Sequence, residues 1–228
     1  MKKLPVSELN RHYKIYFDFD NTISCGDVLD EILKRFTVDK KWLALEEAWQ
    51  KGRIGSKECL AGQLRSVRVT RKTLVRYLKK VKIDPYFKKL YFFLKQKGFH
   101  PVILSDSFTL VIREVLKNNG LKGLPIYANE IRFAGDRLIP SFPYSKGPCG
   151  GCGNCKASHL LKKREKGVKI MFVGDGLSDL CAVDNADIVF AKETLLAYMK
   201  KRHKPCVPFD HLGNVYDFLK KGVIRICL

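Results

Sequence analysis

An apolar run near the start of the chain, residues 13–19, ends abruptly on acidic side chains. The run predicts a buried strand of a parallel sheet, which places Asp18 and Asp20 at its carboxyl end, where ligands of open α/β sheets bind. Buried carboxylates cost free energy unless a cation or hydrogen bonds compensate. The pair therefore indicates a metal and a reaction, with a capping turn built on Asp-Asn-Thr as the structural alternative.

Two later apolar runs end on polar side chains in the same way. Residues 101–105 end on Ser105, whose hydroxyl can hold a phosphoryl oxygen. Residues 168–174 lead into the glycine-flanked Asp175, with Asp179 behind it. Because glycine lets the backbone approach a ligand closely, these strand ends predict one site at one edge of the sheet.

A lysine between these segments completes the pattern. Lys156 follows a loop rich in cysteine and glycine and precedes the helix-like Ala-Ser-His-Leu-Leu, so its ammonium could neutralise a phosphate near the carboxylates. Lys146 is the second candidate for this role. The Gly-Pro that follows Lys146 breaks a helix, whereas Lys156 begins one.

The order of an acidic pair, a serine, a lysine and Gly-Asp with a second aspartate resembles the haloacid dehalogenase superfamily of phosphotransferases. The resemblance implies that Asp18 attacks phosphorus to form an aspartyl-phosphate, while Asp20 protonates the leaving oxygen and later activates water. It also implies a Mg²⁺ ion bound by the Asp18 carboxylate, the Asp20 backbone carbonyl and Asp175. Asp179 is assigned to this metal centre as the residue that orients a metal-bound water or Lys156.

The resemblance further implies a set of side chains that bind the phosphoryl group: Thr22, Ser105, Asp106 and Lys156. Several segments narrow the relationship, among them Gly-Asn-Cys-Lys, Trp42-Leu-Ala-Leu and the closing Val-Pro-Phe-Asp. They resemble the 2-hydroxy-3-keto-5-methylthiopentenyl-1-phosphate phosphatases of methionine salvage. The phosphoethanolamine/phosphocholine phosphatases share the cysteine-rich loop and the Gly-Asp-Gly segment, and are a second group of relatives.

Phosphoserine phosphatases are more distant relatives. They recognise the substrate with a Glu and an Arg, and the corresponding residues of the cap are Asp27 and Gln63. We therefore expect a Mg²⁺-dependent phosphatase of a small phosphorylated metabolite, with the methylthio enol phosphate as leading substrate. Phosphoserine, phosphocholine and phosphoethanolamine are the alternative substrates. A basic nucleic-acid-binding protein on a phosphatase scaffold is the alternative of another class.

The sequence predicts an α/β fold, with a Rossmann-like three-layer parallel sheet core and an inserted helical cap. Residues 25–83 lack strand-like runs and contain helical patterns, including residues 28–36 and 41–50. They form the predicted cap, and residues 1–24 and 84–228 form the predicted core.

The core segments add further expected elements. Residues 84–98 predict a helix that leads into the second strand, and residues 108–119 predict the next helix. Residues 131–139 predict a small hairpin, and residues 186–191 a late strand.

The chain carries a formal charge of +20, with its 43 basic residues spread along the sequence rather than gathered into a tail. This distribution favours a solvated lysine-rich surface over a nucleic-acid site.

No apolar run approaches the ~20 residues of a membrane span, and the N-terminus lacks the apolar segment of a signal peptide. We therefore expect a cytoplasmic enzyme whose partner is a small phosphorylated metabolite, not nucleic acid or a membrane. The oligomeric state stays open.

Eight cysteines in a chain without a secretion signal direct attention to their spacing. Cys149, Cys152 and Cys155 are separated by two residues each in a glycine-rich turn, which lets their sulfurs converge on Zn²⁺ or, less favourably, on an iron–sulfur cluster. His159 is the nearest candidate for a fourth ligand. Three cysteines on other segments are also candidates: Cys25, Cys181 and Cys206. The alternative is a tight loop of reduced thiols that lets Lys156 approach the phosphate.

Overall fold

Seven strands form one sheet in the computed structural model, which describes residues 12–221. The strand order is β4-β3-β2-β1-β5-β6-β7, and neighbouring strands run parallel except β3 and β4, which form an antiparallel hairpin. The strands are β1 (Tyr13–Phe17), β2 (Val102–Phe108), β3 (Ile126–Ala134), β4 (Arg137–Ser141), β5 (Lys169–Gly174), β6 (Ile188–Ala191) and β7 (Val207–Pro208). The strand that bears the acidic pair therefore lies at the centre of the sheet.

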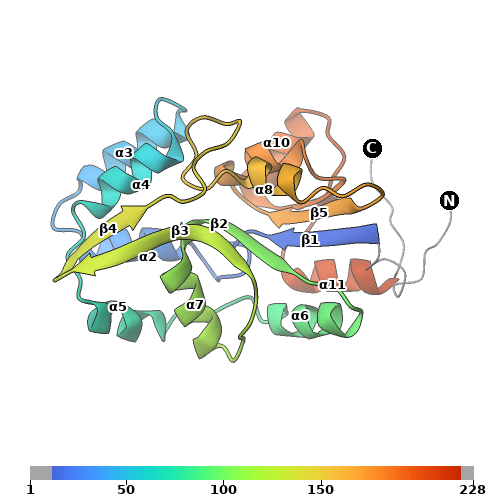
Figure 1. Cartoon of the computed structure of the whole chain (residues 1–228), viewed down its shortest axis with the longest axis horizontal. Helices are drawn as coiled ribbons and strands as arrows, with labels where there is room; N and C mark the ends of the chain where they lie inside the picture. The colour runs from blue at the N-terminus through green and yellow to red at the C-terminus, as the bar shows by residue number, and fades with distance from the viewer. Residues whose placement is uncertain (1–11, 222–228) are drawn as a thin grey trace.

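Helices cover both faces of this sheet, which gives the predicted three layers (Figure 1). In the view of Figure 1, α6, α7 and α11 lie below the sheet, and α8 and α10 lie above it. The core helices are α6 (Phe87–Gln96), α7 (Thr109–Asn118), α8 (Lys156–Lys162), α9 (Leu180–Val183), α10 (Glu193–Lys201) and α11 (Leu212–Lys221).

Alternate side chains of the central strands supply the two hydrophobic layers. In β1, Ile15 and Phe17 belong to the large core cluster that also includes residues of α6, α7 and α11, whereas Tyr16 belongs to a smaller cluster with Leu160 of α8. Successive side chains of a strand point to opposite faces of the sheet. A strand buried on both faces needs apolar residues at consecutive positions, which is why the central strands were visible in the sequence as continuous apolar runs.

Of the five helices between β1 and β2, the first four form the helical cap and the fifth, α6, belongs to the core. The cap helices are α2 (Val28–Phe36), α3 (Lys41–Gln50), α4 (Ser56–Leu64) and α5 (Arg71–Leu78). The chain enters and leaves this insertion through one antiparallel bridge, between Ser24 and Ile83. Backbone hydrogen bonds from Cys25 to Lys82 (3.0 Å) and from Asp84 to Ile23 (2.8 Å) flank the bridge. The predicted fold class is confirmed.

Two element boundaries differ from the sequence-based expectation. The second strand does not end at Ser105 but continues to Phe108, because its pairing with β3 shifts register between Leu104 and Phe108. A bulge of this kind redirects side chains without ending a strand. The hairpin expected at residues 131–139 also has longer strands.

Within residues 12–221, no helix combines the length and the apolar composition that crossing a membrane requires.

Candidate active site

The carboxyl ends of β1 and β5 bring three aspartates together. Asp18 follows β1 directly, and its backbone N–H donates to the carbonyl of Val173 on β5 at 2.9 Å. Carboxylate oxygens of Asp18, Asp175 and Asp179 all lie within 4.8 Å of one another, and all three residues are buried. The predicted convergence of these strand ends is therefore present in the structure.

Lys156 supplies the positive charge at this cluster. Its Nζ donates to Asp179 Oδ1 at 2.6 Å and to Ser178 Oγ at 3.1 Å, and it lies 2.8 Å from Asp18 Oδ1. The residue is fully buried. Burial alone would lower the pKa of Lys156, but Asp179 and Asp18 outweigh burial and hold that pKa above its usual value. Lys156 therefore carries its charge throughout the physiological range.

Asp179 holds the loop after β5 in position. Its Oδ2 accepts the backbone N–H groups of Asp175 (2.9 Å) and Gly176 (3.1 Å), while its Oδ1 accepts from Lys156. A Cβ at Gly174 would meet Oδ2 of Asp179 at 2.3 Å, so this glycine is needed for the close approach. Both oxygens of Asp179 are therefore engaged, and its expected role in orienting Lys156 or a metal-bound water stays a prediction.

The other aspartates of the site carry raised pKa values. Burial raises the pKa of Asp18, and this effect outweighs the opposing effect of the Lys156 charge. Burial and the nearby Asp179 raise the pKa of Asp175 to about 7, although Thr22 Oγ1 donates a hydrogen bond to its Oδ1 at 2.7 Å. Thr22 was expected among the phosphate-binding residues, and the structure places its hydroxyl on this carboxylate.

Asp20 faces the same cavity from the start of the cap connection. Its Oδ1 accepts the backbone N–H of Val28 at 2.9 Å, and burial together with the charge of Asp27 raises its pKa. A raised pKa keeps a carboxyl group protonated nearer to neutral pH. Asp20 is therefore suited to donate a proton.

Ser105 and Asp106 reach the site at the bulge of β2. Ser105 Oγ accepts the backbone N–H of Ser107 at 3.0 Å, and Asp106 Oδ1 accepts the backbone N–H of Asn154 at 2.6 Å. Asn154 is buried, and its Nδ2 also donates to the backbone carbonyls of Ser105 (2.9 Å) and Tyr127 (2.7 Å). Sequence reasoning gave Asn154 no role, although it stands two residues before Lys156.

A cavity of about 280 Å³ lies between these residues and the cap. Asp18, Asp20, Ser105 and Asp175 line it from the core. The cap contributes polar and aromatic side chains: Asp27, Asp30, Glu46, Trp49 and Gln63. Within the described residues, no lysine or arginine lines this cavity, and the nearest charge shown for Asp18 is that of the buried Lys156, 2.8 Å from its Oδ1.

The two cap residues expected from the sequence are joined by two that were missed. Asp27 caps α2 by accepting the backbone N–H of Asp30 at 2.8 Å, and Gln63 donates to Glu46 Oε2 at 3.0 Å. Burial, Asp27 and Glu46 raise the pKa of Asp30 to about 6. Glu46 and Asp30 gave no signal in the sequence, because acidic residues on a cap helix usually face solvent.

The donor set at the strand ends suits a divalent cation. Three buried carboxylates, those of Asp18, Asp175 and Asp179, face the single ammonium of Lys156. This imbalance of charge is costly in a buried site unless another cation is present. Carboxylate and carbonyl oxygens are the ligands that Mg²⁺ takes in proteins. The residues present therefore fit Mg²⁺.

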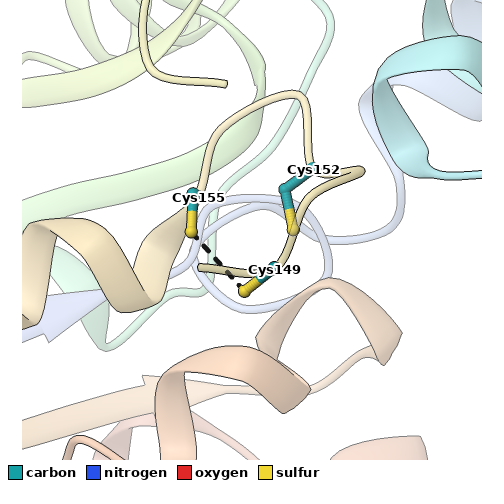
Figure 2. A group of neighbouring side chains, drawn as sticks. All are labelled: Cys149, Cys152 and Cys155. Carbon is teal, nitrogen blue, oxygen red and sulfur yellow. Dashed lines mark hydrogen bonds between the residues drawn. The ribbon is translucent and has the colours of Figure 1, made fainter. Parts of the chain in front are cut away.

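The cysteine loop lies beside this site. Sulfur atoms of Cys149, Cys152 and Cys155 are within 4.8 Å of one another, and Figure 2 shows all three on the loop that precedes α8. His159 does not join them. Its Nε2 pairs with Asn154 Oδ1 at 2.7 Å, and its ring packs against Tyr127 and Tyr144. The expectation of His159 as a fourth ligand is therefore wrong.

Comparison with known proteins identifies relatives of this chain. The family described as Putative Phosphatase matches residues 13–203. The chain is 25% identical over 217 residues to the 2-hydroxy-3-keto-5-methylthiopentenyl-1-phosphate phosphatase of Geobacillus kaustophilus (strain HTA426), covering 93% of this chain and 98% of that protein. The corresponding enzyme of Microcystis aeruginosa is 23% identical, covering 90% and 96% of the two chains.

Solved structures show the same fold. A phosphoserine phosphatase in the form of a phospho-aspartyl intermediate analogue aligns with a TM-score of 0.71 at 18% identity, covering 91% of this chain and 99% of that one. The phosphoserine phosphatase of T. onnurineus aligns with a TM-score of 0.68 at 20% identity, covering 92% and 94%. The chain therefore belongs to the Putative Phosphatase family and is a phosphatase, a hydrolase of phosphoric monoesters.

Proposed function

We propose that this enzyme hydrolyses the phosphomonoester of a small metabolite through an aspartyl-phosphate on Asp18. The contact that carries the proposal joins Asp18 Oδ1 to Lys156 Nζ at 2.8 Å at the wall of the cavity. A carboxylate oxygen of Asp18 forms a bond to phosphorus while the bond from phosphorus to the ester oxygen breaks. Asp20 gives its proton to that oxygen, then takes one from the water that attacks the aspartyl-phosphate and releases phosphate.

Asp18, Asp175 and the backbone carbonyl of Asp20 are the proposed ligands of Mg²⁺, which neutralises phosphoryl charge when bound. Ser105 and Lys156 remain the proposed partners of the phosphoryl oxygens. Lys156 also lowers the negative charge that an incoming phosphate meets at Asp18. Thr22 and Asp106 act in this proposal through their hydrogen bonds to Asp175 and to the backbone of Asn154.

We also propose that the cap formed by residues 25–83 selects the substrate, with residues 1–24 and 84–228 as the core. The cap supplies the side chains that line the cavity opposite Asp18. A cavity of about 280 Å³ that is closed on one side by the cap suits a small metabolite rather than a polymer. The cytoplasmic location expected from the sequence stays a prediction.

The names of the relatives favour the methylthio enol phosphate as substrate. A second candidate is favoured by the cavity itself, which presents Asp27, Asp30 and Glu46 beside the indole of Trp49. Acidic groups next to an aromatic face suit an ammonium group, such as that of phosphoethanolamine or phosphocholine. The same acidic wall repels a carboxylate, so phosphoserine is the least suitable of these substrates.

Steady-state kinetics with Mg²⁺ on these four phosphates test the proposal. We expect kcat/KM for phosphoserine to be the lowest. If the substrate carries an ammonium group, Asp30→Asn and Glu46→Gln should each lower kcat/KM for phosphocholine about tenfold, equivalent to ~1.4 kcal/mol. Neither substitution should change kcat/KM for the methylthio enol phosphate, which has no ammonium group. Preference for phosphoserine would overturn the assignment of the acidic wall. Absence of Mg²⁺-dependent hydrolysis of any small phosphomonoester would overturn the proposed reaction.

A further inference from the structure

A second cluster of metal-binding side chains lies outside the phosphatase site. Cys149, Cys152 and Cys155 place their sulfur atoms around one turn, with Cys149 Sγ and Cys155 Sγ 3.5 Å apart (Figure 2). Cys155 is fully buried, and Cys152 is half-buried. Three thiols held at this separation match the spacing of sulfur atoms around one metal ion, since Zn–S bonds are about 2.3 Å long.

A fourth thiol approaches from a different element. Cys181 lies on α9, and it lines a cavity of about 210 Å³ together with Cys149 and Cys152. The sulfur atoms of Cys149, Cys152 and Cys155 therefore lie together, and Cys181 shares a cavity with two of these cysteines.

We propose that Cys149, Cys152, Cys155 and Cys181 bind one Zn²⁺ ion as a structural site. Four cysteine thiolates are a common ligand set for structural zinc, which prefers tetrahedral sulfur coordination. A disulfide between Cys149 and Cys155 would use only two of the four sulfurs and would leave the approach of Cys152 and Cys181 unexplained. The zinc site itself does not depend on the proposed reaction.

The position of the site connects the two segments that hold the buried ion pair. Cys155 immediately precedes Lys156, and Cys181 follows Asp179 by two residues, while Lys156 Nζ and Asp179 Oδ1 are 2.6 Å apart. An ion bound by both cysteines fixes the distance between the backbones on either side of this pair. We therefore assign the zinc site a positioning role for Lys156, and this second step rests on the proposed function.

The same loop contacts the cap. Gly151 accepts the backbone N–H of Lys57 at 3.1 Å, and Ser56 Oγ accepts the backbone N–H of Gly153 at 2.9 Å. A Cβ at Gly55 would meet the carbonyl oxygen of Gly151 at 2.2 Å, so the two backbones are in close contact. Zinc would therefore stiffen the loop on which the N-terminus of α4 rests.

Elemental analysis of protein purified without added metal tests the site. We expect one zinc per chain, and loss of most of it in each single serine variant at positions 149, 152, 155 and 181. Cys25→Ser is the matched control, since Cys25 is exposed at the base of the cap and outside the cluster, and it should keep its zinc. Asp18→Asn should also keep its zinc while losing activity, which separates this proposal from the proposed reaction.

Replacement of zinc by cobalt gives a readout that does not depend on activity. We expect the absorption of a tetrahedral cobalt–thiolate centre, lost in Cys181→Ser, and a lower melting temperature after the metal is removed with a chelator. Metal-free protein whose unreduced form contains a disulfide, or metal-free protein with four free thiols, would overturn the proposal. Full zinc content in Cys181→Ser would overturn the assignment of the fourth ligand.

Discussion

At the scale of single residues, the site depends on carboxylates that are buried at strand ends. Asp18→Asn removes the nucleophile and one charge while keeping nearly the same volume. We expect turnover to fall by several orders of magnitude, because loss of a covalent nucleophile removes the first chemical step. Single-turnover assays on the folded variant provide the measurement. A variant that retains more than about a tenth of wild-type turnover would remove Asp18 from the nucleophilic role.

The buried His159 leads to a second prediction at this scale, about the pH dependence of the stability of the fold. Burial lowers its pKa to about 4, from about 6.5 in an unfolded chain. Between these two values, the unfolded protein binds a proton that the folded protein excludes, so the free energy of unfolding falls as the pH falls. The loss of stability begins as the pH falls through about 6.5 and can approach ~1.4 kcal/mol per pH unit within the window.

His159→Gln should flatten this dependence, because glutamine can still donate to Asn154 Oδ1 but does not titrate. Chemical denaturation of both proteins at about pH 7 and about pH 5 measures the difference. Equal slopes for the two proteins would show that His159 is not the titrating group.

At the scale of elements, the cap and the cysteine loop are predicted to act together. Gly55→Ala would place a Cβ 2.2 Å from the carbonyl oxygen of Gly151, so one backbone must move. We expect a stability cost of about 1–3 kcal/mol and a lower kcat/KM, since the cap lines the cavity. Gly151→Ala meets Gly55 Cα at the milder distance of 3.1 Å and should have a smaller effect. Thermal melting and kinetics on both variants provide the measurement. A larger loss of stability in Gly151→Ala than in Gly55→Ala would contradict the importance of this contact.

The elements also show what a sequence can and cannot predict. The strands before Asp18 and Asp175 were predicted because a strand buried on both faces needs consecutive apolar residues. The end of β2 was misplaced, because a bulge near Ser105 leaves no pattern in the apolar residues. The spacing left Cys25, Cys181 and Cys206 as equal candidates for a fourth ligand and made His159 the nearest one. Proximity in sequence does not show that His159 pairs with Asn154, or that Cys181 shares a cavity with Cys149 and Cys152.

At the scale of the whole molecule, the charge of +20 and the acidic cavity have opposite signs. A basic surface attracts anions of every kind. The proposed function requires that this attraction does not give nucleic acid a high affinity for the protein. We expect only weak competition by duplex or single-stranded nucleic acid for hydrolysis of a small phosphomonoester at physiological salt. Binding by nucleic acid should also weaken steeply as salt rises. Sub-micromolar binding that suppresses hydrolysis would favour the nucleic-acid alternative.

The central place of β1 has a consequence for how the protein is made. β1 precedes both of its neighbours, β2 and β5, along the chain, and they pair with it through Val102 and Lys169 among others. A nascent chain that ends before Lys169 must leave one edge of β1 unpaired, with apolar side chains on both faces. Unpaired apolar strands are templates for contacts between chains. The strand that leads to the nucleophile is thus open to pairing with other chains until β5 has emerged from the ribosome.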